Sequence, residues 1–311
     1  MIRALDEFFI MNLVITGASG FVGTALVERL AAAGHGLTLL SRSPRASRVA
    51  GKVSWRRWDS LAPEEWQDAL DGCDGVIHLA GEPIAGKRWS ESQKERLRSS
   101  RIDTTRAIVD ALGKAQRRPR FLINASAVGY YGPHGDEVLT ESAPAGKDFL
   151  GQLCAAWEAE ANKAKELGLR VALLRTGIVL GKGKGALARM VFPFKMFAGG
   201  RLGSGKQWFP WIHIEDEVGL IHFLIEHENA EGPFNGSAPN PVTMDEFCKA
   251  LGRVLNRPSW APVPASLLSL LLGEMADMLL TGQRALPEAA QKLGFEFKHT
   301  DVVRALQSLD L

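Results

Sequence analysis

Three hydroxyl-bearing side chains in the stretch "SAVGYYG" (126–132) are suited to proton transfer: Ser126, Tyr130 and Tyr131. The serine could hold a carbonyl or hydroxyl oxygen, and a neutral tyrosine can act as a general acid. An unassisted tyrosine has a pKa near ~10, so only about one in a thousand is ionised at neutral pH. We take these three residues as the candidate catalytic set. The alternative is a turn whose aromatic rings pack on a ligand or close the site.

A second motif, "TGASGFVG" (16–23), is typical of a phosphate-binding turn because it spaces Gly17, Gly20 and Gly23 in a GxxGxxG pattern. The first glycine permits a tight turn, the second lets backbone approach a pyrophosphate, and the third lets a helix pack closely on a strand. The helix N-terminus then faces the anion. This pattern predicts dinucleotide binding, and a glycine-rich turn without a ligand is the alternative.

The residues that end the second predicted strand indicate which dinucleotide binds. Most NAD-binding proteins place an acid there, which holds the ribose 2′-hydroxyl. This chain instead reads "LLSRSPR", with Ser41, Arg42 and Arg45 and no acid. A guanidinium can pair with a 2′-phosphate, whereas a carboxylate would repel it. We therefore predict NADP(H) as the cofactor, and the alternative is that Arg42 is a solvated loop charge.

The elements that must position these motifs alternate along the first 181 residues. Apolar runs predict strands and apolar residues at helical spacing predict helices. The strands are expected at 12–17, 36–43, 75–81, 120–126 and 170–181, and the helices at 20–34, 90–114 and 148–166. This alternation predicts an α/β fold, a Rossmann-type doubly wound parallel sheet.

A change of composition after residue 181 predicts a smaller C-terminal substrate-side domain. Residues 181–214 contain no Asp or Glu but six basic residues, namely Lys182, Lys184, Arg189, Lys195, Arg201 and Lys206. They could hold a phosphate-bearing substrate, or they could form a solvated lid. We expect residues 1–180 and 217–239 to form the NADP-binding domain, and residues 181–216 and 240–311 the substrate-side domain. The apolar run at 266–280 is predicted to be a helix packed on a core.

Whole-chain composition describes an ordinary globular protein. The formal net charge is +2 and 23% of residues are charged, so we expect neither nucleic acid nor a membrane as a partner. The three cysteines lie far apart without CxxC spacing, which predicts no metal site and favours a reducing cytoplasm. His213 in "WIHIED" is expected to be structural rather than a catalytic base. A homodimer is left open.

The motifs "TGASGFVG", "VIHLAG", "INASAVGYYG", "LLRTGIVLG" and "WIHIED" occur in this order, and the chain therefore resembles the extended short-chain dehydrogenase/reductases. This is the NAD-dependent epimerase/dehydratase superfamily. The segments "FPWIHIEDEVGLI" and "ALPEAAQKLGFEF" are similar to an atypical subgroup labelled epimerase family proteins, or sugar-nucleotide epimerases. The resemblance covers residues 11–311.

The resemblance implies cofactor contacts along the glycine loop and at several strand ends. In this numbering they are Gly17, Ala18, Ser19, Gly20, Phe21, Val22, Gly23, Ser41, Arg42, Asp59, Leu79, Ala80, Gly81, Arg101 and Ile178. Asp59 would lie near the adenine and Ile178 on the nicotinamide side. Arg101 would reach the cofactor from a long helix, although a solvated helix face is the alternative for that residue.

The resemblance also implies a catalytic tyrosine with a lysine four residues later, and this chain has no YxxxK anywhere. If Glu158 takes the family's downstream glutamate, Leu150 and Cys154 occupy the two positions, and neither can replace the pair. Two hypotheses follow. One is an NADP(H)-dependent oxidoreductase or epimerase that acts on a small hydroxyl or carbonyl compound, for example a sugar nucleotide, with another acid/base group. The alternative is a non-catalytic NADPH-binding sensor or regulatory protein.

Overall fold

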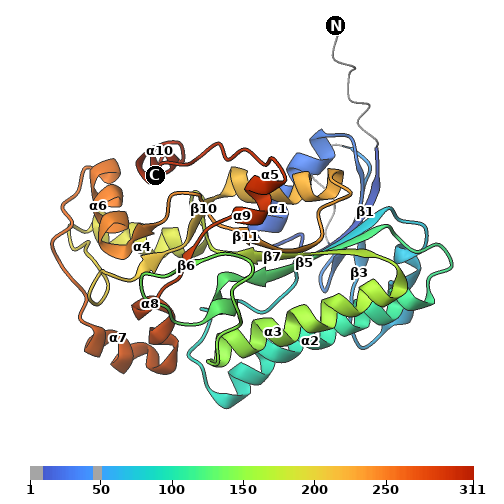
Figure 1. Ribbon diagram of the computed structural model, residues 1–311, viewed down its shortest axis with the longest axis horizontal. Helices are drawn as coiled ribbons and strands as arrows, with labels where there is room; N and C mark the ends of the chain where they lie inside the picture. The colour runs from blue at the N-terminus through green and yellow to red at the C-terminus, as the bar shows by residue number, and fades with distance from the viewer. Residues whose placement is uncertain (1–9, 45–50) are drawn as a thin grey trace, which may run out of the picture.

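A seven-stranded parallel sheet organises the first part of the chain, in the order β11-β7-β5-β4-β1-β2-β3 (Figure 1). The computed structural model describes residues 10–44 and 51–311, and Arg45 lies outside them. The strands are β1 (Asn12–Thr16), β2 (Gly36–Ser41), β3 (Val53–Arg57), β4 (Gly75–His78), β5 (Phe121–Ala127), β7 (Arg170–Thr176) and β11 (Gly232–Gly236). Strand order reverses at β1, whose neighbours are β2 on one side and β4 on the other. The predicted doubly wound Rossmann-type sheet is confirmed.

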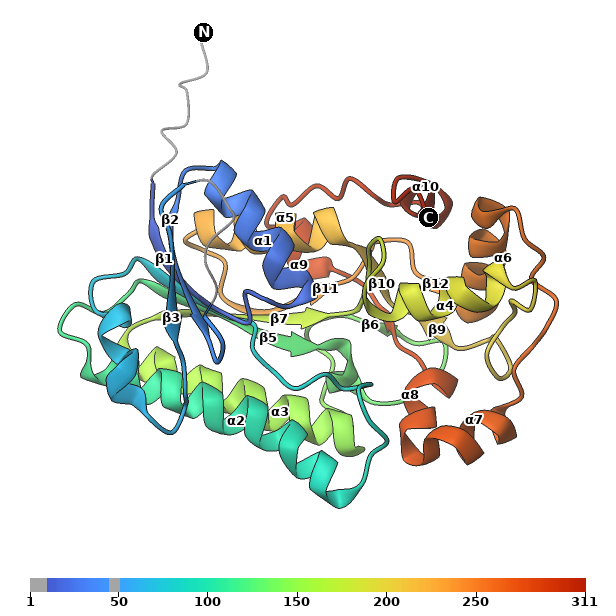
Figure 2. The same ribbon diagram turned by 180° about the vertical axis from the view of Figure 1, so that it is seen from behind.

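Helices cover both faces of this sheet, which explains why its central strands are buried along most of their length. Helices α1 (Phe21–Ala32) and α5 (Ile214–Glu226) lie on one face (Figure 2). Helices α2 (Glu91–Lys114) and α3 (Phe149–Asn162) run side by side on the other. Each face has its own apolar core, so residues that alternate along β1 point to different cores: Leu13 and Ile15 to the first, Val14 to the second.

A third core lies at one end of the molecule, in the C-terminal unit. It is built from α4 (Gly185–Lys195), α6 (Met244–Leu255) and α10 (Val302–Gln307), together with two short pairs, β8 (Ile178–Leu180) with β10 (Trp211–His213) and β9 (Trp208–Phe209) with β12 (Val242–Thr243). The remaining α-helices and strands are α7 (Ala265–Leu272), α8 (Asp277–Leu280), α9 (Glu288–Lys292) and the paired strands β6 (Val138–Leu139) and β13 (Arg284–Ala285). Tyr130 and Tyr131 lie in a short 3₁₀ helix, Val128–Tyr131. The boundaries between the two domains stay a prediction.

Two expected elements differ from those in the structure. The strand expected at 170–181 divides at Gly177 into β7 and β8, because backbone crowds this residue: a Cβ atom there would lie 2.2 Å from the carbonyl oxygen of Pro210. The helix expected at 266–280 ends at Gly273, which has a φ of +61°. Only Leu268 of α7 is buried, so the prediction that this run packs on a core was wrong for most of α7.

No helix within residues 10–44 and 51–311 has both the length and the apolar content needed to cross a bilayer.

Candidate active site

The glycine loop joins β1 to α1 at the carboxyl edge of the sheet, where backbone leaves no room for side chains. Gly17 has a φ of +72°, and a Cβ atom on it would lie 2.7 Å from the carbonyl carbon of Leu79. A Cβ atom on Gly23 would lie 2.2 Å from the carbonyl oxygen of Gly17. Gly20 begins the helix without any side-chain cap, so the first N–H groups of α1 are available to an anion. This cradle fits the pyrophosphate of a dinucleotide.

The other loop residues of the predicted set line the same turn. Ser19 and Gly20 are exposed, Ala18 is buried, and Val22 is half-buried on the first turn of α1. The ring of Phe21 points toward the start of the C-terminal unit, since a Cβ atom on Gly181 would lie 2.4 Å from its Cζ. The loop therefore contacts both parts of the molecule.

We expect Gly17→Ala to abolish dinucleotide binding, because the added methyl group meets the backbone of Leu79 and Gly17 has a left-handed φ. Gly168→Ala is the matched control: Gly168 has a φ of +85°, but a Cβ atom on it would meet no described atom within 4 Å. That control should cost only about 1 kcal/mol of stability and keep binding. The measurement is a fluorescence titration with NADPH and NADH, and equal binding by both variants would contradict the role of the cradle.

Ser41 ends β2 and Arg42 follows it, at the same edge of the sheet as the glycine loop that follows the neighbouring strand β1. The Ser41 hydroxyl donates to the carbonyl of Ser43 at 3.3 Å, while the Arg42 side chain is exposed. The backbone N–H of Trp58 donates to the Ser41 carbonyl at 2.9 Å, which brings the following residue, Asp59, to the same edge. The Asp59 carboxylate accepts from the N–H of Leu61 at 2.9 Å. The Arg42 side chain is thus exposed at this edge of the sheet.

The third predicted stretch follows β4 and is held by β1 and α2. The N–H of Ala80 donates to Thr16 Oγ1 at 3.3 Å. Arg101 reaches over from α2, where its Nη2 donates to the carbonyl of Glu82 at 3.0 Å and its guanidinium lies 5.2 Å from the Trp157 ring centroid. Burial lowers the pKa of Arg101 from its ordinary value. Arg101 is thus half-buried beside Gly81 rather than on a solvated helix face.

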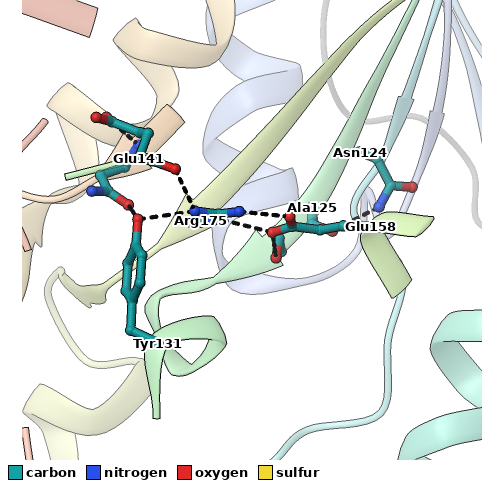
Figure 3. Close-up of polar contacts among 8 residues, drawn as sticks. Asn124, Ala125, Tyr131, Glu141, Glu158 and Arg175 are labelled. Carbon is teal, nitrogen blue, oxygen red and sulfur yellow. Dashed lines mark hydrogen bonds and ion pairs between the residues drawn. The ribbon is translucent and has the colours of Figure 1, made fainter. Parts of the chain in front are cut away.

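Ser126 and Tyr131 belong to a buried polar network at the ends of β5 and β7. Figure 3 shows Tyr131, Arg175 and Glu158 of this network. The Ser126 hydroxyl donates to Glu158 Oε1 at 2.6 Å. Arg175 binds both oxygens of Glu158, with Nε and Nη2 each at 2.8 Å, and its Nη1 donates to the Tyr131 hydroxyl at 3.1 Å. Burial lowers the pKa of Arg175, but the hydrogen bonds and charge of Glu158 outweigh it, so this pKa lies above its ordinary value.

The two tyrosines differ in their access to solvent. Tyr131 is 1% exposed, its hydroxyl donates to Asn235 Oδ1 at 2.7 Å, and burial raises its pKa to about 12. Tyr130 follows β5 in the same turn but is half-buried, and the Arg175 guanidinium lies 3.4 Å from its ring centroid. Tyr131 is therefore buried and held by hydrogen bonds, whereas part of Tyr130 remains accessible to solvent.

The positions aligned with the family's tyrosine and lysine have no basic group. Leu150 packs beside Gly129, because a Cβ atom on that glycine would lie 3.4 Å from the leucine Cβ. Cys154 is buried, and burial raises the pKa of its thiol to about 12, so the thiol is neutral. Ile178 begins β8, two residues after β7 ends, and is half-buried.

Sequence reasoning missed one buried acid, Glu217. It lies on α5, is 1% exposed and accepts a hydrogen bond from Thr176 Oγ1 at 2.7 Å. Its Oε2 has no hydrogen-bonding partner among the described residues. Burial raises the pKa of Glu217 to about 7. The available signal was an acid directly before the largely apolar stretch "VGLIHFLI" (218–225).

His213, Glu215 and His299 also lie together, with ligand atoms within 4.8 Å of one another. The two imidazole rings stack at a centroid distance of 3.7 Å, 30° from parallel, so their in-plane lone pairs run alongside one another instead of converging on one ion. His213 Nδ1 accepts from the N–H of Glu215 at 3.1 Å, and burial lowers the pKa of His213 to about 4. This geometry suits a helix cap better than a metal centre.

Residues 13–235 match the NAD dependent epimerase/dehydratase family, and residues 263–309 match a domain of unknown function. The chain is 45% identical over 302 residues to an epimerase family protein homologue of Arabidopsis thaliana described as chloroplastic, with 96% of this chain and 86% of the relative covered. The chain belongs to the NAD-dependent epimerase/dehydratase family.

Other members of the epimerase family resemble the chain over nearly its whole length. The Bacillus subtilis epimerase family protein YfhF is 41% identical, with 96% of this chain and 98% of the relative covered. The human epimerase family protein SDR39U1, solved with NADPH, has a TM-score of 0.86 at 33% identity, covering 96% of this chain and 99% of that one. A nucleoside-diphosphate sugar epimerase from Corynebacterium glutamicum has a TM-score of 0.78 at 33% identity, covering 97% and 59%. The protein is an NAD(P)-binding member of this family.

Proposed function

We propose that this protein binds NADP(H) in preference to NAD(H). The main support for this preference is Arg42, at the end of β2. Its side chain is exposed beside the cradle, and the strand end offers no acid to hold a ribose 2′-hydroxyl or to repel a 2′-phosphate. The human relative solved with NADPH supports this choice. The contacts proposed for the glycine loop, Ser41, Asp59, residues 79–81, Arg101 and Ile178 follow from their positions around one edge of the sheet.

We expect Arg42→Ala to weaken NADPH binding by about tenfold to a hundredfold, because it removes a charge-assisted pair with the 2′-phosphate. Binding of NADH should not change, because NADH has no group at that position. Side-by-side titrations of wild type and variant with both cofactors measure this difference. Arg56→Ala is the control, since Arg56 is on the adjacent strand β3 and already pairs with Asp68. Equal affinity of the wild type for the two cofactors would contradict the proposal.

We further propose that the protein is an oxidoreductase or epimerase that acts on a small hydroxyl or carbonyl compound. A bound nicotinamide supplies the hydride acceptor or donor. Tyr130 is the better placed of the two tyrosines to protonate a substrate oxygen, because it is half-buried, whereas Tyr131 is 1% exposed and its hydroxyl is bonded to Asn235. Ser126 and Tyr131 then act mainly through the network that holds Tyr130 and Arg175 in place. Their direct participation stays a prediction.

Sugar nucleotides are the first substrates to test. The C-terminal unit begins with a stretch of basic residues without an acid, and the Corynebacterium relative is a nucleoside-diphosphate sugar epimerase. A panel of carbonyl compounds and nucleotide sugars, followed at the absorbance of NADPH and by chromatography of the sugars, tests turnover. Chromatography is needed because an epimerisation returns its hydride and leaves the absorbance unchanged.

One observation favours the alternative, a non-catalytic NADPH-binding sensor or regulatory protein. Leu150 and the neutral thiol of Cys154 occupy the positions of the family's acid/base pair. Tight cofactor binding without turnover of any substrate in the panel would favour this second function over the first.

A further inference from the structure

An exposed apolar patch lies at the end of the molecule formed by the C-terminal unit. Its members are four large side chains that are each more than half exposed: Phe192, Met196, Phe197 and Trp260. We call them the distal patch. Phe192 and Met196 lie one helical turn apart, Phe197 follows Met196, and Trp260 Nε1 donates to the carbonyl of Phe197 at 2.8 Å, so the four residues belong to one region of the surface. Exposed apolar residues that gather in this way mark an interaction surface.

The backbone conformation of Phe197 indicates that its aromatic ring has a function. Helix α4 ends in a Schellman arrangement, in which the N–H of Ala198 donates to the carbonyl of Pro193 at 2.9 Å. Phe197 is the left-handed residue of that arrangement, with a φ of +59°. Glycine is the usual residue here, because a bulky side chain strains this conformation. The chain instead places an aromatic ring at this position and leaves it 56% exposed.

A cationic cavity adjoins the distal patch. It has a volume of about 500 Å³, and its lining includes three basic residues from the middle of α6 to just beyond its end, Lys249, Arg253 and Arg257. Asp245 pairs with Lys249 at 2.6 Å and so neutralises one of them. The guanidinium of Arg257 lies 4.4 Å from the Phe197 ring centroid, which joins the cavity to the patch. The Nε of Arg257 is buried without a hydrogen-bonding partner among the described residues.

We propose that the distal patch docks on an anionic phospholipid surface, with Phe192, Phe197 and Trp260 in the interface and a lipid phosphate in the cavity of Arg253 and Arg257. Aromatic and basic side chains together are the composition of interfacial membrane-binding surfaces. Charge complementarity decides for an anionic surface, because Lys195 beside Met196 and the cavity residues Arg253 and Arg257 form no ion pair within residues 10–44 and 51–311. Elsewhere in residues 181–214, Lys182 pairs with Asp310 and Arg201 with Asp245. The expectation of no membrane partner rests on charge averaged over the whole chain. Such an average does not show that aromatic and basic side chains cluster at one place on the surface.

Co-sedimentation of the full chain with vesicles tests the proposal. Wild type should bind vesicles of mixed phosphatidylglycerol and phosphatidylcholine, and should bind pure phosphatidylcholine vesicles about tenfold more weakly. Phe197→Gly should weaken binding to the anionic vesicles by a similar factor of about ten. Its melting temperature should stay the same or rise, because glycine adopts the left-handed conformation without strain. Leu61→Ser is the control, since Leu61 is 91% exposed but lies outside the C-terminal unit, and it should bind like wild type.

A second variant, Arg253→Gln, tests the cavity. It should weaken binding to anionic vesicles more than binding to phosphatidylcholine vesicles, because the choline group offsets the phosphate charge in phosphatidylcholine. Absence of wild-type sedimentation with anionic vesicles would overturn the proposal, as would equal losses in Phe197→Gly and Leu61→Ser. A dimer in light scattering that Phe197→Gly dissociates, in a protein that does not bind vesicles, would assign the patch to a second copy of the chain instead. Inorganic phosphate bound in the cavity without vesicle binding would likewise overturn the lipid assignment.

Discussion

Glu158→Ala should lower the free energy of unfolding by about 3–5 kcal/mol, because it leaves the Arg175 guanidinium buried without its partner. Both side chains are under 10% exposed, and the arginine binds both carboxylate oxygens. The change also removes the acceptor of the Ser126 hydroxyl. Urea denaturation followed by circular dichroism measures the loss.

Glu160→Ala is the matched control, two residues along the same helix. Glu160 is as buried as Glu158 in the structure, but its partners Arg106 and Lys163 are about half exposed, so solvent can take over their charges. Its replacement should cost about 1 kcal/mol or less. The double variant Glu158→Leu/Arg175→Met should be more stable than Glu158→Ala, because it leaves no unpaired buried charge. Equal losses of stability in Glu158→Ala and Glu160→Ala would contradict a special contribution of the Glu158–Arg175 ion pair to stability.

Glu217→Gln should stabilise the protein at pH 8 by about 3 kcal/mol and have little effect near pH 4.5. Burial raises the pKa of Glu217 to about 7 in the folded state, against 4.5 for a free carboxyl group. The folded state therefore holds its proton more tightly than the unfolded state. That contribution to stability is fully present below pH 4.5 and is lost as the pH rises through 7, where a charge must form in the core. Glutamine stays neutral and avoids this loss.

Unfolding free energies measured between pH 4.5 and 8.5 test this prediction. Glu228→Gln is the control because its side chain is 90% exposed, and its pH profile should follow that of wild type. If the Glu217→Gln and wild-type profiles run parallel over this range, the carboxyl group is not protonated in the core at neutral pH. The unpartnered Oε2 would then need another explanation.

The arrangement of the sheet could be predicted because each central strand is buried on both faces. Such strands read as continuous apolar runs, as in β1, β4 and β5. Strand β3 was not expected, because it lies at the edge of the sheet and mixes polar and apolar residues in "VSWRR". The break at Gly177 was also missed, since the carbonyl of Pro210 that crowds it comes from a distant part of the chain.

The sequence by itself determined the fold of the part that contains the parallel sheet, and the place of its glycine cradle, because those properties depend on local spacing. Gly17 must be glycine because the turn is tight, and Gly23 because the helix packs closely on the strand. A strand–turn–helix pattern in the sequence already predicts both features. Only the tertiary structure decided which tyrosine is accessible, which groups hold Ser126, and which buried acid has an oxygen without a hydrogen-bonding partner among the described residues. Those outcomes depend on burial and on partners such as Arg175, Asn235 and Thr176, which folding brings together from separate strands.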